Sequence, residues 1–366
     1  MDLDEAARAN TKRSDPSLLF HVQSASTASL LHYTNKTSMK REIQAGLQEI
    51  RPGRTLFVRE WILTSDDGAA KGKRTAAAAA AAAAEDYDIQ LLFVHGSCAT
   101  ELQFHRLCSS LSEKLSKGTT IRCIMYDSLG CGQSPVVSDW NAYATTELQH
   151  DFGAILERYF VMHQNTPLYV CCHSYAPNIV LPWINQHQES SSSSSFLDNL
   201  QGFIFLGTSI RIDDNLPYPD QGHPIFRLPV WILRCLQSSM TKDFVEKAVV
   251  DESLKAEFLM ASDANDMAMV QAFYRQTRWM RREEFRQAMG VSLSSPPYRV
   301  LQIHGVHDQI IPIEHGQATF NQLLSSSSDD KPPSDFQFIA VEGASHMVMI
   351  EKADEVADHV QKFLKL

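Results

Sequence analysis

One stretch of ten residues, 168–177, constrains the fold of this chain more than any other. It reads Leu-Tyr-Val-Cys-Cys-His-Ser-Tyr-Ala-Pro, so a short apolar run ends at His173 and a helical pattern opens at Pro177. The chain must therefore reverse sharply at Ser174. A strand, a tight turn with a serine at its tip and a helix form a nucleophile elbow, in which the hydroxyl projects beyond the sheet. We predict that Ser174 is a catalytic nucleophile.

Strand-like and helical segments alternate along most of the chain. Apolar runs typical of buried strands lie at 89–94, 121–126, 168–172, 202–206, 298–303 and 336–341. Helical patterns separate most of these runs, and a strand-like hairpin at 47–64, with a turn at Pro52 and Gly53, precedes them. Buried strands separated by helical crossovers indicate parallel strands with both faces covered. The sequence predicts an α/β fold with a mostly parallel sheet flanked by helices.

The remaining segments predict how the chain is divided. Residues 1–44 lack a sustained period and are predicted to be a loosely ordered N-terminal extension. Consecutive helical patterns replace the alternation at 209–296, which predicts a helical cap inserted into a core of residues 45–208 and 297–366. Three low-complexity runs, predicted to be insertions between core elements, lie at 65–85, 190–195 and 325–333.

Composition argues against several classes of protein. The chain has 366 residues, and 43 Asp and Glu against 33 Lys and Arg give a net charge of -10, so no nucleic-acid partner is expected. No apolar run reaches the roughly 18 residues that cross a bilayer. The acidic start Met1-Asp-Leu-Asp-Glu5 differs from a targeting signal, which favours a cytoplasmic location. The seven cysteines lack CxxC spacing, so we expect reduced thiols rather than disulfides or a metal site.

Two further residues complete an acyl-transfer site with Ser174. A serine hydroxyl needs an imidazole to accept its proton and a carboxylate to orient that imidazole. Asp308 and His346 each follow a predicted strand, and open α/β sheets place their sites at that edge. The chain order Ser174, Asp308, His346 gives nucleophile, acid and base. Asp213 and Asp214 follow an earlier strand and are the alternative acids.

A tetrahedral intermediate also needs backbone N–H donors aimed at its negative oxygen. Tyr175, directly after the nucleophile, is predicted to supply one. Ser97, the first residue after His95 and Gly96, is predicted to supply the second, with Cys98 as the alternative. His95 is predicted to fix this loop by hydrogen bonding rather than to take part in chemistry.

These motifs resemble those of α/β-hydrolase-fold serine hydrolases from Gln48 to the C-terminus. The matching motifs are His95-Gly96, Asp127-x-x-Gly130-x-Gly132-x-Ser134, His173-Ser174-Tyr175 and Gly305-x-x-Asp308-x-x-x-Pro312. Within this family the chain is most similar to the abhydrolase-domain-containing protein eight subgroup. The matches to that subgroup are Leu301-x-x-His304-Gly-x-His-Asp308-x-x-x-Pro-x-Glu314 and Glu342-Gly-x-Ser-His346-Met-Val-Met-Ile-Glu351. The resemblance implies a hydrolase without a cofactor whose catalytic triad is Ser174, Asp308 and His346.

The chain departs from the family pattern in two places. Cys172 and Ala176 stand where the pattern Gly-x-Ser-x-Gly has glycines, which let the strand and helix backbones approach closely around a strained serine. This departure motivates a competing hypothesis, a binding or scaffold protein with the same fold and little turnover. Glu351 stands where relatives with acyltransferase activity have an aspartate after the base, which argues against that activity.

The residues together predict a serine hydrolase that cleaves a carboxylic ester, such as a lipid or acyl ester, through an acyl-enzyme. Serine at position 174 argues against an epoxide hydrolase or a dehalogenase, which would need an aspartate there. The expected partner is a small-molecule ester or lipid substrate. The apolar run 229–236 in the cap would suit a lipid-sized pocket and leaves peripheral membrane contact open. The oligomeric state is left undefined.

Overall fold

A computed structural model describes residues 40–65, 87–163, 165–188, 197–211, 220–290, 298–324 and 335–366. The predicted extension as far as residue 39 and the alternative acids Asp213 and Asp214 lie outside these ranges. So do the three predicted low-complexity insertions, apart from Ser65.

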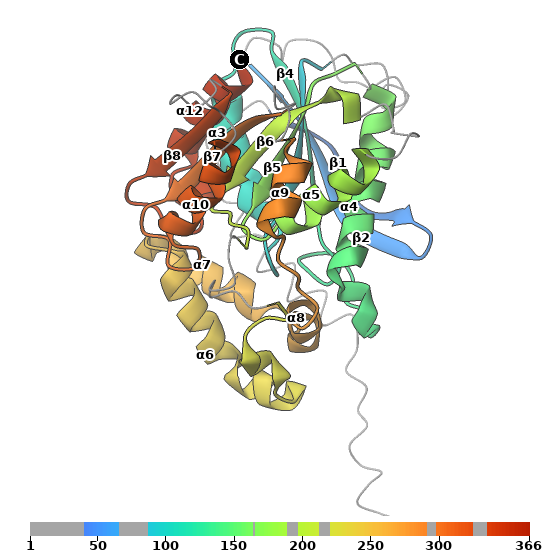
Figure 1. Cartoon of the computed structure of the whole chain (residues 1–366), viewed down its shortest axis with the longest axis vertical. Helices are drawn as coiled ribbons and strands as arrows, with labels where there is room; N and C mark the ends of the chain where they lie inside the picture. The colour runs from blue at the N-terminus through green and yellow to red at the C-terminus, as the bar shows by residue number, and fades with distance from the viewer. Residues whose placement is uncertain are drawn as a thin grey trace, which may run out of the picture. The chain divides into compact units, whose positions relative to one another are not determined.

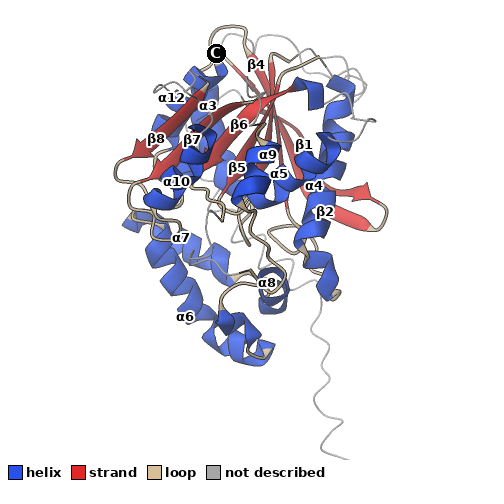
Figure 2. Cartoon of the chain, viewed as in Figure 1, coloured by secondary structure: helices blue, strands red, loops and turns tan. Residues whose placement is uncertain are grey.

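The described core is built on one eight-stranded sheet (Figures 1 and 2). Its strands are β1 (Lys40–Arg51), β2 (Arg54–Thr64), β3 (Ile89–Val94), β4 (Thr120–Asp127), β5 (Leu168–His173), β6 (Leu200–Leu206), β7 (Arg299–Gly305) and β8 (Phe336–Val341). Their spatial order is β1-β2-β4-β3-β5-β6-β7-β8. Strand β2 is antiparallel to both β1 and β4, and all the other neighbours are parallel. The predicted α/β fold with a mostly parallel sheet is confirmed.

The opening hairpin is longer than the sequence indicated. Strand β1 begins at Lys40, which pairs with Leu63 of β2, so residues 40–44 belong to the sheet and not to the predicted extension. Most side chains in this first part of β1 are exposed, because β1 is an edge strand with one neighbour. An exposed edge strand lacks the apolar pattern that marks a buried one, which explains the error.

Helices cover both faces of the sheet. They are α3 (His105–Glu113), α4 (Thr145–Phe160), α5 (Pro177–Gln188), α9 (Arg282–Ala288), α10 (Ile313–Leu324), α11 (Val348–Glu351) and α12 (Ala353–Leu364). Helices α3 and α12 pack together over one face, whereas α4, α5, α9 and α10 cover the other (Figure 1). Strand β5 contributes side chains to the hydrophobic clusters on both faces of the sheet. Val170 and Cys172 belong to one cluster, and Tyr169 and Cys171 belong to the other.

Three helices between β6 and β7 lie beyond the end of the sheet in Figure 1: α6 (Val230–Ala248), α7 (Glu252–Asp263) and α8 (Met267–Tyr274). The apolar pattern of the sequence indicates two separate helices, at 226–236 and 244–250, where α6 is continuous. Helix α9 falls within the range 209–296 predicted for the cap, yet it packs against α5 and α10 of the core. We therefore use the word cap for α6 to α8. None of the described helices is both long and apolar enough to cross a membrane.

Candidate active site

Ser174 occupies the tight turn between β5 and α5. The strand ends at His173 and the helix begins at Pro177, whose missing N–H has no partner to lose in a first helical turn. Ser174 has φ +55°, a left-handed conformation that is strained for a residue with a Cβ atom. Its N–H donates to the carbonyl of Leu206 on β6 at 3.0 Å. This cross-strand bond helps to hold the strained serine at the carboxyl edge of the sheet.

The elbow accommodates the two residues that replace glycine. Cys172 and Ala176 are fully buried, and both belong to the hydrophobic cluster beneath α4 and α5. The close approach to the serine comes instead from Gly96, in the loop after β3. A Cβ atom on Gly96 would lie 2.7 Å from the Cβ of Ser174, which is too short for any real contact. A glycine is therefore required at position 96.

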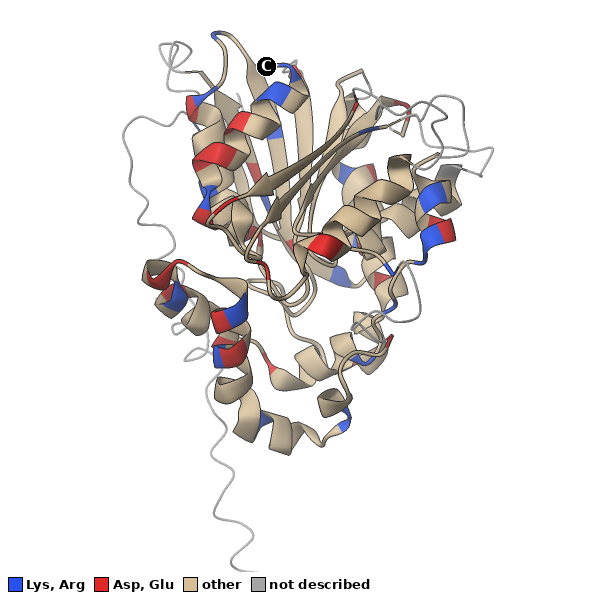
Figure 3. Cartoon of the chain, turned by 60° about the vertical axis from the view of Figure 1, so that its left-hand side comes forward, with Lys and Arg blue, Asp and Glu red and all other residues tan. Residues whose placement is uncertain are grey.

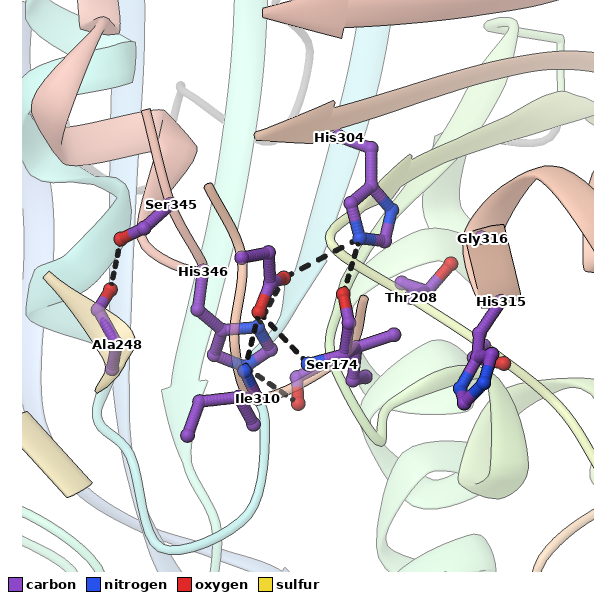
Figure 4. Close-up of polar contacts among 12 residues, drawn as sticks. Ser174, Thr208, Ala248, His304, Ile310, His315, Gly316, Ser345 and His346 are labelled. Atoms are coloured by element: carbon purple, nitrogen blue, oxygen red, sulfur yellow. Dashed lines mark hydrogen bonds and ion pairs between the residues drawn. The ribbon is translucent and has the colours of Figure 1, made fainter. Parts of the chain in front are cut away.

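Three strand ends bring Ser174, Asp308 and His346 together. Figure 4 shows Ser174 beside His346. Nε2 of His346 lies 3.0 Å from Oγ of Ser174, and Nδ1 of His346 lies 2.8 Å from Oδ2 of Asp308. All three side chains are buried, with exposed fractions of 9% for Ser174, 5% for Asp308 and 2% for His346. The arrangement is a continuous hydrogen-bonded path from hydroxyl to imidazole to carboxylate.

Asp308 is held by more groups than the sequence indicated. Its Oδ1 accepts the N–H groups of Ile310 and Ile311, each at 2.8 Å. Its Oδ2 faces His346 and also lies 3.4 Å from Nε2 of His304. Burial favours the neutral acid, but attraction to His346 and hydrogen bonds from both histidines outweigh it and lower the pKa of Asp308. An ionised Asp308 accepts a hydrogen bond from the N–H at Nδ1 of His346, which leaves the lone pair of Nε2 facing the hydroxyl of Ser174.

His173, directly before Ser174, supports the base. Its Nε2 donates to the backbone carbonyl of His346 at 3.1 Å, and the two rings lie 4.8 Å apart. Burial, together with the nearby His346, lowers the pKa of His173 well below its ordinary value. His173 therefore stays neutral and does not compete with His346 for the serine proton.

The loop after β3 is fixed by His95. The N–H of Ser128 donates to Nε2 of His95 at 2.8 Å, so Nδ1 carries the proton and donates to the carbonyl of Gly96 at 2.7 Å. Burial lowers the pKa of His95 to about 4, which keeps the ring neutral in this tautomer. From the cap side, Nδ2 of Asn265 donates to the carbonyl of Cys98 at 3.1 Å. Both sides of the site thus hold the loop that carries Ser97.

A cavity of about 610 Å³ lies between this loop and the cap. Ser97 and Tyr175, the predicted oxyanion donors, line it together with Cys98; Ser174 itself is not in contact with it. Its apolar walls include Ile225, Phe226, Met240, Phe244, Met267, Val270, Trp279 and Ile310. A cavity of this size and lining suits an apolar ligand of drug or short-lipid size.

Tyr175 and Asn178 join the elbow to the segment that returns from the cap. The hydroxyl of Tyr175 donates to the carbonyl of Arg278 at 2.7 Å and accepts the N–H of the same residue at 3.0 Å. The N–H of Met280 donates to Oδ1 of Asn178 at 2.7 Å. Sequence reasoning missed both contacts, because they join residues about one hundred positions apart and follow no local motif.

The fold and this set of residues define a class of protein. Residues 91–359 match the alpha/beta hydrolase family, to which the chain therefore belongs. Solved structures similar to it include an esterase from Exiguobacterium antarcticum (15% identity, TM-score 0.60) and a bromoperoxidase from Bacillus anthracis (14% identity, TM-score 0.59). Each match covers 88% of this chain and 100% of the other. A putative lipase from Acinetobacter baumannii AYE has 14% identity and a TM-score of 0.57, with 98% of both chains covered. No curated protein matches the chain.

Proposed function

We propose that this chain is a serine hydrolase that cleaves a carboxylic ester through an acyl-enzyme. The observation that carries the proposal is the hydrogen-bonded path from Oγ of Ser174 through His346 to Asp308, at a strained strand-to-helix turn. Membership of the alpha/beta hydrolase family supports the same class of chemistry.

The proposed reaction has two halves. His346 takes the proton of Ser174 through Nε2 as Oγ attacks the ester carbonyl carbon, and Asp308 stabilises the imidazolium that forms. Backbone N–H groups of Ser97 and Tyr175 bind the negative oxygen of the tetrahedral intermediate. His346 then protonates the departing alcohol and next activates a water molecule that hydrolyses the acyl-enzyme. Serine, histidine and aspartate end in their starting states, so the cycle needs no cofactor.

We further propose that the substrate is a lipid or acyl ester. The apolar cavity begins at Ser97 and Tyr175, so an acyl chain could lie along α6 while its carbonyl meets Ser174. We also propose that the chain belongs to the abhydrolase-domain-containing protein eight subgroup and that it is cytoplasmic. Both proposals are supported by the sequence alone.

Peripheral membrane contact through the outer face of α6 is a related proposal. Trp231 and Leu236 of α6 and Leu228 just before the helix are exposed, Trp231 to 67%, and the chain has no acidic residue over 221–242. Charges of both signs gather instead near the other end of α6 and on α7 (Figure 3). Tryptophan favours membrane interfaces. Wild type should sediment with anionic lipid vesicles more than Trp231→Ala does, and equal sedimentation would contradict the proposal.

A fluorophosphonate probe tests the proposed function against the competing scaffold hypothesis. The probe forms a bond only with an activated serine, so wild type should label and Ser174→Ala should not. Ser110→Ala is a matched control, because Ser110 is also buried but lies on α3. A folded wild type that never labels would favour the scaffold hypothesis, which Cys172 and Ala176 motivate.

A further inference from the structure

Glu351 joins two segments that are about one hundred residues apart in sequence. Its Oε1 accepts the N–H groups of Val250 at 2.7 Å and Asp251 at 3.0 Å, in the turn between α6 and α7. Its Oε2 accepts the N–H of Ser345 at 2.7 Å and lies 2.9 Å from Oγ of Ser345, whose single proton it shares with the carbonyl of Ala248. Ser345 directly precedes His346. One carboxylate therefore binds the turn of the cap to the loop that carries the base.

Further contacts strengthen the same junction. Oγ of Ser345 lies 2.5 Å from the carbonyl of Ala248, the last residue of α6 (Figure 4). The N–H of Met347 donates to the same carbonyl at 3.3 Å. The residues on both sides of His346 thus contact the end of α6. The same helix lines the cavity through Met240 and Phe244.

Three backbone N–H groups and one shared hydroxyl surround Glu351 and match a carboxylate in particular. Oε1 accepts two backbone N–H groups and Oε2 accepts one, and charge-assisted bonds of this kind are stronger than neutral ones. A glutamine has one oxygen and one NH₂ group, so it could serve the turn at 250–251 or Ser345, but not both. The carboxylate of Glu351 faces backbone N–H groups, whereas the hydroxyl of Ser174 lies against His346. Glu351 is therefore placed to position other residues rather than to take part in the reaction itself.

We propose that Glu351 is a positioning residue that couples the cap to His346, so that the α6–α7 turn and the orientation of the base depend on one another. The effect of this coupling on catalysis rests on the proposed function, whereas the structural coupling of the two segments does not. Substrate that displaces α6 would change the placement of the base through this carboxylate and through the contacts of Ala248 beside it.

Hydrogen exchange of the full chain tests the coupling without any substrate. In Glu351→Gln, peptides that cover 248–251 and 343–347 should both exchange about tenfold faster than in wild type, since the Glu351 carboxylate accepts N–H groups from both segments. Glu355→Gln is the matched control, because Glu355 is exposed on the next helix. Faster exchange in one segment only, or in neither, overturns the proposal. Ser345→Ala removes only the hydroxyl and should give a smaller change in both segments, which tests the coupling even if Glu351→Gln fails to fold.

The kcat per labelled active site distinguishes a loss of coupling from a loss of folded protein. Fluorophosphonate titration counts the competent sites, and the kcat for an acetyl ester per labelled site should fall about tenfold in Glu351→Gln. A role in stability alone would lower the number of sites and leave kcat per site unchanged, which would overturn the proposal. If wild type never labels, the proposed function fails, while the exchange experiment still decides the coupling.

Discussion

The two walls of the site are built in different ways. On the core side, Ser174, Asp308 and His346 follow three strands and are buried and hydrogen-bonded, and backbone N–H groups fix the carboxylate. On the cap side, mainly apolar side chains of α6 to α8 line an open cavity. Strand ends place polar groups precisely, whereas apolar contacts are non-directional and tolerate the substitution of one apolar side chain by another. The core wall should therefore determine the rate of the chemistry and the cap wall the choice of acyl group.

The largest expected effect is loss of the nucleophile. Ser174→Ala should lower kcat for a short ester by about 10⁴-fold or more, because no acyl-enzyme can form. The measurement is initial-rate kinetics on protein whose folding is checked by circular dichroism. Activity that persists in a well-folded Ser174→Ala would show that another residue carries the reaction.

Replacing the carboxylate on the same wall should have the next largest effect. Asp308→Asn removes the charge that stabilises the imidazolium and can turn His346 to the wrong tautomer, so kcat should fall about 10³- to 10⁴-fold. The lowered pKa of Asp308 favours the charged carboxylate in the wild type. Initial-rate kinetics with the same short ester measures the loss, and a well-folded Asp308→Asn with unchanged kcat would contradict this assignment.

The contrast between the walls also explains what the sequence could and could not predict. A buried strand followed by a polar residue is a local pattern, so the strands and the positions of Ser174 and Asp308 could be located without a structure. Helix α6 could not be recognised as continuous, because part of its inner face lines a cavity and carries Gln237 and Thr241, which interrupt the apolar period. The bonds from Glu351 to Val250 and Asp251 join distant segments and depend on tertiary packing, which no local pattern reveals.

A smaller effect, on stability, should come from the buried His95 of the core wall. Its pKa is lowered to about 4 in the folded chain, against about 6.5 in an unfolded one. As the pH falls from about 6.5 to 4, the unfolded chain gains a proton that the folded chain does not, so the free energy of unfolding decreases. The decrease from this one group should be roughly 3 kcal/mol, and it should level off below pH 4. Urea unfolding between pH 7 and 4 measures it.

A substitution at position 95 isolates this contribution. His95→Gln cannot take up a proton, so its free energy of unfolding should vary less with pH than that of wild type over the same range. His187→Gln is a suitable control, because His187 is a partly buried histidine at the end of α5, away from the site. Equal pH dependence in wild type and His95→Gln would mean that His95 does not account for the effect.

The smallest expected effect lies on the cap wall and concerns selectivity. Phe244 lines the cavity from α6, so Phe244→Ala should lower kcat/KM for an octanoyl ester about tenfold through lost apolar contact. The value for an acetyl ester should hardly change, since a two-carbon acyl group offers little apolar surface for Phe244 to contact. Leu236→Ala is the control, because Leu236 lies on the same helix but is exposed and does not line the cavity. Equal losses for both esters in Phe244→Ala would place the cap in the chemistry itself, and the division of labour between the two walls would be wrong.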